Sequence, residues 1–227
     1  MSIFYIVATP IGNLSDFSPR AVETLQSVDY IACEDTRTSG KLLKHFGIDK
    51  QTFSFHLHNE HKKVGHLMNI LNANQNVALI SDAGMPGISD PGFLAVRAAQ
   101  KDGHTVCVIP GPDAATTALV ASGLPCDRYV FEGFLPHKKG RQKRLSQLAE
   151  EERTLIIYES PNRLLKLIDE LEKYFGEDRL MSVSRELTKK FEEIQRGTII
   201  EMKTEFSSRD SIKGEIVVVV AGKGYSE

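Results

Sequence analysis

The chain contains 227 residues, of which 41% are hydrophobic and 26% are charged, and its net charge is -2. This composition is typical of a globular protein; it excludes a largely disordered chain and a polycation held on nucleic acid by its global charge. The three cysteines are scattered, and the longest strongly apolar run, residues 216–221, is far too short to span a bilayer. We therefore expect a reduced, soluble and cytoplasmic protein without a membrane span.

In the first half of the chain, short apolar runs alternate with segments of helical periodicity. The runs predicted as buried strands are residues 3–8, 30–33, 77–80 and 105–109. Helical spacing of apolar residues is present in 42–46 and 67–71. This alternation predicts βαβ units and therefore a parallel sheet in an α/β fold.

After residue 122 charged residues become about twice as dense, although the net charge stays near zero. Two helices are predicted there, at 142–152 and 162–174, and strands at 129–131, 154–158, 180–184, 197–202 and 214–220. No long helix is expected between the last three strands, which suggests a mixed sheet with antiparallel hairpins. The sequence thus predicts two α/β domains, residues 1–122 and 123–227.

Three unusual turns directly follow predicted strands of the first domain. They are 8–13, 81–92 and 110–115, and all are rich in glycine, proline and small residues. In α/β proteins ligands bind beyond the carboxyl ends of the strands. Asp82 suits a ribose hydroxyl or an amine, whereas Asp90 before Pro91 is expected to cap the next helix. Spacing and composition by themselves predict an adenosine-like or phosphate-bearing small ligand.

The same segments carry a family resemblance. The sequence resembles the tetrapyrrole-methylase superfamily of class III S-adenosylmethionine methyltransferases, and within it the bacterial ribosomal RNA small subunit methyltransferase I family. The matching segments follow one another in order over nearly the whole chain: 5–14, 33–37, 81–92, 110–112, 121–125, 131–136, 158–161, 185–189, 197–198 and 213–215. The resemblance implies two α/β domains with a cofactor cleft between them, and a homodimer.

The resemblance also implies a set of S-adenosylmethionine contacts. Carried over residue by residue, they are Pro10, Ser81, Asp82, Met85, Asp113, Ala114, Glu159 and Leu187. Met85 stands where the family usually has threonine, and Asp113 where it usually has serine. Many contacts in this superfamily are made by the backbone, with which both exchanges are compatible.

Methyl transfer to a ribose hydroxyl requires a base or a cation that stabilises the alkoxide. Residues 34–37 follow the second strand, and in the resembling methylases an acidic residue near this position transfers a proton, which favours Glu34. The candidate catalytic residues are Glu34, Asp35, Arg37, Arg185 and Lys189. Alternatively, Asp35 or Thr36 caps the next helix with Arg37 as its ion-pair partner, and 185–189 is a solvated strand end.

A cationic segment and a histidine-rich segment complete the candidate sites. Residues 137–144 contain the candidate RNA ligands Lys138, Lys139, Arg141, Lys143 and Arg144. The alternative is a solvated face, and a tetrapyrrole substrate would also attract cations. Four histidines between residues 56 and 66 lack cysteine or aspartate partners, so no metal site is expected.

From the resemblance, the predicted function is S-adenosylmethionine-dependent 2′-O-methylation of a cytidine ribose in 16S rRNA, free or in the small ribosomal subunit. The alternatives are a precorrin or uroporphyrinogen methyltransferase, which shares fold and cofactor, and a non-enzymatic RNA-binding module. A measurement of S-adenosylmethionine binding distinguishes these alternatives, because both enzymes bind it and the RNA-binding module does not.

Overall fold

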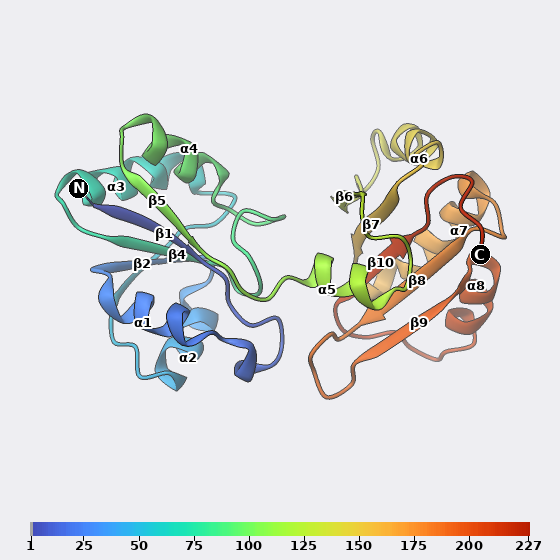
Figure 1. Cartoon of the computed structure of the whole chain (residues 1–227), viewed down its shortest axis with the longest axis horizontal. Helices are drawn as coiled ribbons and strands as arrows, with labels where there is room; N and C mark the ends of the chain where they lie inside the picture. The colour runs from blue at the N-terminus through green and yellow to red at the C-terminus, as the bar shows by residue number, and fades with distance from the viewer. Residues whose placement is uncertain (1) are drawn as a thin grey trace. The chain divides into compact units, whose positions relative to one another are not determined.

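The computed structural model describes residues 2–227, and the chain divides into two compact units, Met1–Asp113 and Ala114–Glu227. Each unit contains its own five-stranded sheet (Figure 1). Helix α5 (Ala114–Ala121) lies in the second unit, where it packs on β10 (Ile216–Val220) and buries Ala115, Ala118 and Leu119. The division thus precedes α5, whereas charge density changes after this helix.

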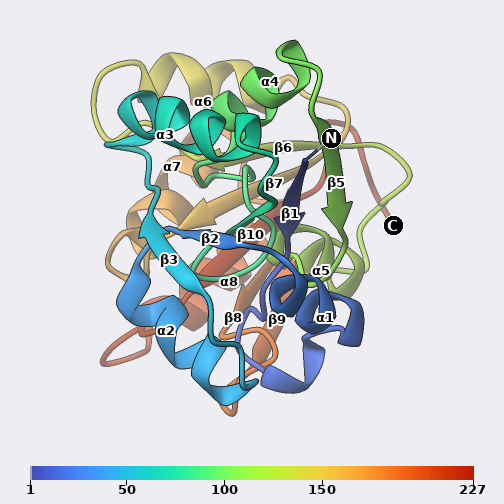
Figure 2. The ribbon, with the colours of Figure 1, turned by 90° about the vertical axis from the view of Figure 1, so that its left-hand side faces the viewer.

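The first unit is a parallel sheet covered by helices on both faces. Its strands are β1 (Ile3–Val7), β2 (Tyr30–Cys33), β3 (Gln51–Ser54), β4 (Val77–Ile80) and β5 (Thr105–Ile109), in the order β3-β2-β4-β1-β5. Helices α1 (Pro19–Ser27) and α2 (Thr36–His45) cover one face, and α3 (Glu60–Asn72) and α4 (Phe93–Lys101) the other (Figures 1 and 2). This arrangement confirms the predicted α/β class, because strands buried on both faces read as continuous apolar runs.

The second unit has a mixed sheet in the order β6-β7-β10-β8-β9. The remaining strands are β6 (Tyr129–Phe134), β7 (Thr154–Glu159), β8 (Leu180–Arg185) and β9 (Glu193–Thr198); only β6 and β7 pair in parallel. Helices α6 (Arg141–Ala149), α7 (Leu164–Phe175) and α8 (Ile199–Ser207) complete the unit. Leu145, Leu167 and Phe206, one from each helix, pack into a core whose central strand β10 is wholly buried.

The prediction of a strand at 197–202 is wrong. Strand β9 ends at Thr198 and α8 begins at the next residue. The Thr198 side chain accepts a hydrogen bond from the Glu201 N–H, and the Glu201 carboxylate accepts one from the Thr198 N–H at 2.8 Å. This reciprocal capping box turns the chain from strand into helix. None of the helices in residues 2–227 is long and apolar enough to cross a membrane.

Candidate functional site

The turns after β1, β4 and β5 meet at the carboxyl edge of the first sheet. Thr9 and Gly84 exchange two backbone hydrogen bonds, of 2.9 and 3.1 Å, which tie the first turn to the second. Gly111, in the third turn, approaches Ala8 so closely that an added Cβ would lie 2.9 Å from the Ala8 Cβ. Only glycine fits that contact, so the three small-residue turns predicted from the sequence form one surface.

Three carboxylates influence one another at this edge. Burial, followed by the Glu34 charge, raises the pKa of Asp90 to about 7. Burial, followed by the Asp82 charge, raises the pKa of Glu34. Burial also raises the pKa of Asp82, although its Oδ1 accepts a hydrogen bond from the Asp35 N–H at 3.2 Å. Carboxyl groups whose pKa values are raised by burial and like charge cluster at functional sites.

Asp35 and Arg37 have a local structural role, which matches the capping alternative. Asp35 is the N-cap of α2, where its carboxylate accepts a hydrogen bond from the Arg37 N–H at 2.8 Å and pairs with the Arg37 guanidinium. These hydrogen bonds lower the pKa of Asp35 to about 2. A carboxylate so strongly stabilised in its charged form is a poor base, so Glu34 is the better candidate base of this segment.

Asp90 does not cap the helix that follows it, contrary to the prediction. Helix α4 begins after Gly92, and its first N–H groups are capped from another helix. The buried Glu60 carboxylate accepts hydrogen bonds from the Gly92 and Leu94 N–H groups, at 3.0 and 3.1 Å. Asp90 is thereby released from a capping role, and its half-buried carboxyl belongs to the cluster with Glu34. Sequence reasoning missed Glu60, because its capping role depends on a contact between distant segments.

His56 is a further residue at the carboxyl edge. It follows β3, the neighbour of β2, and its positive form would lower the pKa of Glu34, so the two side chains are close. The His56 Nδ1 atom is buried and has no hydrogen-bond partner among the described residues. In the sequence this histidine drew notice only as part of a possible metal cluster. Residues 2–227 contain no group of three or more side chains placed to hold a metal ion.

Arg185 and Lys189 are held in ion pairs inside the second unit. The Arg185 guanidinium pairs with Glu193 at 3.0 Å, and the Lys189 ammonium lies 2.8 Å from a Glu186 carboxylate oxygen and 2.9 Å from one of Glu215. These partners compensate both cations, so neither offers a free charge to an alkoxide. Leu187, between them, is buried.

The cationic segment divides into buried and exposed cations. Arg141 is 4% exposed; it pairs with Glu170 at 2.7 Å and lies 3.5 Å from the Glu159 carboxylate. Arg144 pairs with Glu132. The predicted role in RNA binding is therefore wrong for the Arg141 side chain, because a buried guanidinium cannot reach a phosphate, and Arg144 is already neutralised. The exposed cations of the segment are Lys138, Lys139 and Lys143.

The Glu159 carboxylate is buried, and its Oε2 has no hydrogen-bond partner among the described residues. Its Oε1 accepts a hydrogen bond from the Ser160 N–H at 2.8 Å and pairs with Arg163 at 2.5 Å. Breaking a buried ion pair by removing one partner typically destabilises a protein by about 3–5 kcal/mol, so replacement of Glu159 is expected to destabilise the second unit.

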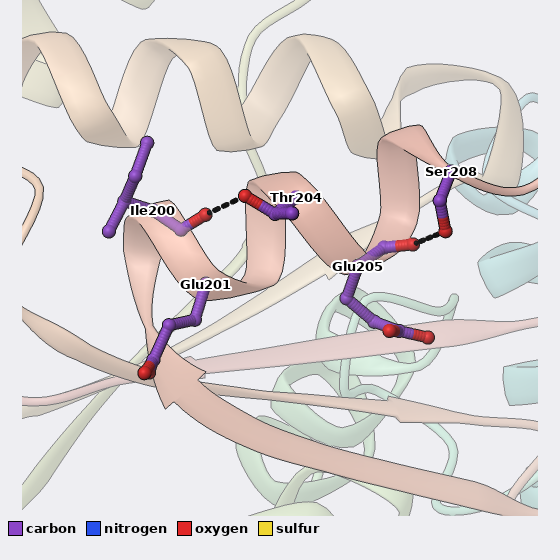
Figure 3. Close-up of a pocket in the computed structure, with 5 residues that line it drawn as sticks. All are labelled: Ile200, Glu201, Thr204, Glu205 and Ser208. Carbon is purple, nitrogen blue, oxygen red and sulfur yellow. Dashed lines mark hydrogen bonds between the residues drawn. The ribbon is translucent and has the colours of Figure 1, made fainter.

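The remaining predicted contact residues lie at strand ends. Pro10 and Ser81 are buried in the joined turns, and Met85 is half-buried in the same surface. Asp113 lies in the third turn, and Ala114 begins α5. A shallow groove elsewhere, along α8, contains none of the predicted site residues (Figure 3). The hydroxyls that line this groove donate to carbonyls of the same helix, Thr204 to Ile200 and Ser208 to Glu205.

The first unit is a parallel sheet with carboxylates and small-residue turns at its carboxyl edge, and a unit with a mixed sheet follows it. The family comparison shows which class of enzymes has this arrangement. The sequence profile described as Tetrapyrrole (Corrin/Porphyrin) Methylases matches residues 4–203. The chain belongs to this family. It is a methyltransferase with S-adenosylmethionine as its methyl donor.

Similar proteins narrow the class further. The chain is 51% identical to "Ribosomal RNA small subunit methyltransferase I" of Synechocystis sp., over 98% of this chain and 80% of that protein. It is 50% identical to the protein of the same name from Haemophilus influenzae, over 99% and 80% of the two chains. These identities extend over both units.

Two solved structures have the same fold at low sequence identity. The uroporphyrin-III-C-methyltransferase of Thermus thermophilus is 18% identical, with a TM-score of 0.67 over 97% of this chain and 94% of that one. The methyltransferase CobJ is 16% identical, with a TM-score of 0.73 over 100% and 96% of the chains. They confirm the predicted tetrapyrrole-methylase fold.

The carboxylates at the carboxyl edge of the first sheet are opposite in charge to the two cationic groups of S-adenosylmethionine. S-adenosylmethionine carries a sulfonium and an ammonium cation, and its ribose hydroxyls donate hydrogen bonds. Two carboxylates at this edge are negatively charged hydrogen-bond acceptors: Asp82, which is exposed on the joined turns, and Asp90, which is half-buried. Burial and like charge raise the pKa values of these carboxyl groups, so a bound cation would stabilise their ionised forms.

Proposed function

We propose that the protein transfers the methyl group of S-adenosylmethionine to the 2′-hydroxyl of a cytidine ribose in 16S rRNA. The observation that carries this proposal is the identity of about half of all residues, over nearly the whole chain, to proteins named ribosomal RNA small subunit methyltransferase I. The structures named for porphyrin and corrin chemistry share only the fold, at 16–18% identity. A tetrapyrrole substrate is therefore the weaker alternative.

In this proposal Glu34 accepts the proton of the ribose hydroxyl. A ribose hydroxyl is a weak acid, so a base whose pKa lies closer to neutrality than that of an ordinary carboxylate is the better acceptor. Burial and the neighbouring Asp82 raise the pKa of Glu34 in this direction. Asp82 and the joined turns hold the methyl donor, and S-adenosylmethionine supplies the electrophilic methyl group. We further propose a cytoplasmic homodimer that acts without a membrane.

The test is a methylation assay with the purified protein and isotopically labelled S-adenosylmethionine. The substrates are a 16S rRNA transcript, the assembled small subunit and uroporphyrinogen III. We expect label in RNA, recovered after nuclease digestion as a cytidine methylated on its ribose. Label on a base, or on uroporphyrinogen alone, would contradict the proposal. Mapping ribose methylation in 16S rRNA from a deletion strain identifies the nucleotide.

We predict that the exposed lysines of the cationic segment bind phosphate. The variant Lys138→Ala/Lys139→Ala/Lys143→Ala should weaken 16S rRNA binding, and the slope of log affinity against log salt should fall by up to about 3, or about 1 per lost contact. S-adenosylmethionine affinity should not change. The control removes three exposed lysines from other helices, Lys44, Lys101 and Lys166. Equal RNA affinity in the two variants would remove this segment from the interface.

A further inference from the structure

A single aromatic side chain stands exposed in the loop that joins β8 to β9. Phe191 retains 65% of its accessible surface, whereas Phe175 and Phe206 of the same unit lie in the core. The loop leaves β8 and returns into β9 at one end of the second sheet (Figure 1). Phe134, in β6 of the same unit, is also exposed, at 55%. Covering an exposed phenylalanine ring with a partner is favourable, so Phe191 is a candidate contact residue.

The backbone that carries Phe191 is firmly held. The Arg185 guanidinium donates a hydrogen bond to the Phe191 carbonyl at 3.1 Å, and the Glu192 carboxylate accepts one from the Thr188 N–H at 2.5 Å. Glu186 and Thr188 have φ values of 53° and 65°, in the left-handed region that side chains other than glycine rarely adopt. Such strained residues persist where the surrounding contacts impose them. The ring is thus presented by an ordered loop.

A second loop, residues 213–215, packs against the first. Arg185 also donates to the Lys213 carbonyl, at 3.2 Å, so one guanidinium bridges the two loops. The Glu215 N–H donates to the Glu186 carboxylate at 3.0 Å. Gly214 leaves no room for a side chain, because an added Cβ would lie 2.4 Å from the Glu186 Cγ. Arg185 is therefore a positioning residue for both loops.

On the surface formed by these two loops, most charged side chains are in ion pairs, but two lysines are not. The carboxylates of Glu186 and Glu215 pair with Lys189, and that of Glu193 pairs with Arg185 and Arg209. Lys190 and Lys213 are exposed, and neither has a carboxylate within ion-pair distance in residues 2–227. The Lys190 ammonium lies 5.6 Å from the centre of the Phe191 ring. The exposed ring is thus bordered by two lysines without a carboxylate partner, while the neighbouring Glu192 carboxylate accepts the Thr188 N–H and adds one negative charge.

We propose that Phe191 stacks on an unpaired base of the RNA substrate while Lys190 and Lys213 contact the flanking phosphates. Proteins bind single-stranded RNA through aromatic rings set among cations, since every base has a face for stacking and every nucleotide a phosphate. One ring bordered by two lysines is too small a surface for a stable protein interface, but it matches one nucleotide. The inference rests on the proposed RNA substrate and adds a contact outside the first unit.

Affinity measurements with a 16S rRNA transcript test the stacking contact. Phe191→Ala should weaken binding about 10-fold, as loss of one base–aromatic stack does, with S-adenosylmethionine affinity unchanged. Phe191→Leu should weaken it similarly, because leucine is apolar but cannot stack, whereas Phe191→Tyr should retain it. Leu165→Ala, which removes another exposed apolar side chain of this unit, is the matched control and should bind as wild type.

Fluorescence supplies an independent measurement, because the chain has no tryptophan. The indole introduced by Phe191→Trp should be quenched when the transcript is added, and the indole introduced by Leu165→Trp should not. Wild-type affinity in Phe191→Ala or in Phe191→Leu, or equal quenching of the two indoles, would overturn the inference while leaving the proposed function intact. A wild-type protein that neither binds nor methylates the transcript or the assembled small subunit would overturn both.

Discussion

Replacement of Glu34 by glutamine should lower kcat for RNA methylation by about 100-fold or more, the usual contribution of a general base. The affinities for S-adenosylmethionine and RNA should change little, since glutamine keeps the shape of the side chain and loses only its ability to accept the proton. Single-turnover kinetics with saturating cofactor, together with calorimetric binding of each ligand, measure this difference.

The pH dependence of the wild-type enzyme gives the same prediction a second readout. Burial and the Asp82 charge raise the pKa of Glu34, and a base must be ionised to act. The rate should therefore increase as the pH rises through a value above the ordinary glutamate range and then level off. In Asp35→Asn the helix cap is kept, because asparagine caps a helix as well as aspartate does, but the profile should shift to lower pH, since the Asp35 charge contributes to the raised pKa of Glu34. A Glu34→Gln enzyme with wild-type turnover would exclude this base.

Asp82→Arg should abolish S-adenosylmethionine binding without unfolding the protein. Asp82 is exposed, so its replacement leaves the core intact, but it places a cation beside the predicted site of a ligand that carries a sulfonium and an ammonium cation and is positive overall. Like charges in such proximity cost several kcal/mol, which corresponds to an affinity loss of at least about 100-fold. Calorimetry measures the binding, and circular dichroism with thermal unfolding verifies the fold.

The control for this charge reversal is Asp102→Arg. Asp102 is also exposed, but it ends α4 and precedes β5, so it lies toward the amino edge of the same sheet. The two variants have the same net charge, and only Asp82→Arg should lose the cofactor. Retained affinity in Asp82→Arg would place the cofactor site away from the carboxyl edge.

Most of the fold follows from local pattern, and the exceptions have local explanations. The four predicted strands of the first unit are β1, β2, β4 and β5. Strand β3 escaped prediction because its residues, at the edge of the sheet, are exposed or half-buried and form no apolar run. The start of α8 was assigned to a strand because Thr198 and Ile199 suit either element. The capping box with Glu201 decides for the helix.

The candidate site was predicted in its location more accurately than in its residues. The turns rich in glycine and proline follow β1, β4 and β5, as strand and turn signals indicate, and hydrogen bonds join the first two. The roles of charged residues were harder to predict, because Asp35 and Asp90 have similar sequence contexts yet one caps a helix and the other does not. What separates them is Glu60, a buried carboxylate from another helix that occupies the start of α4.

The sequence by itself determined the family, the alternation of strands and helices, and the three small-residue turns, because these depend on residues close together in the chain. The tertiary structure decided which charges are available. Arg141 is buried against Glu170, and Arg185 bridges two loops. Burial and the Glu34 charge raise the pKa of Asp90 to about 7. Ionisation and ion pairing depend on burial and on partners brought together only by folding, and local sequence does not specify either.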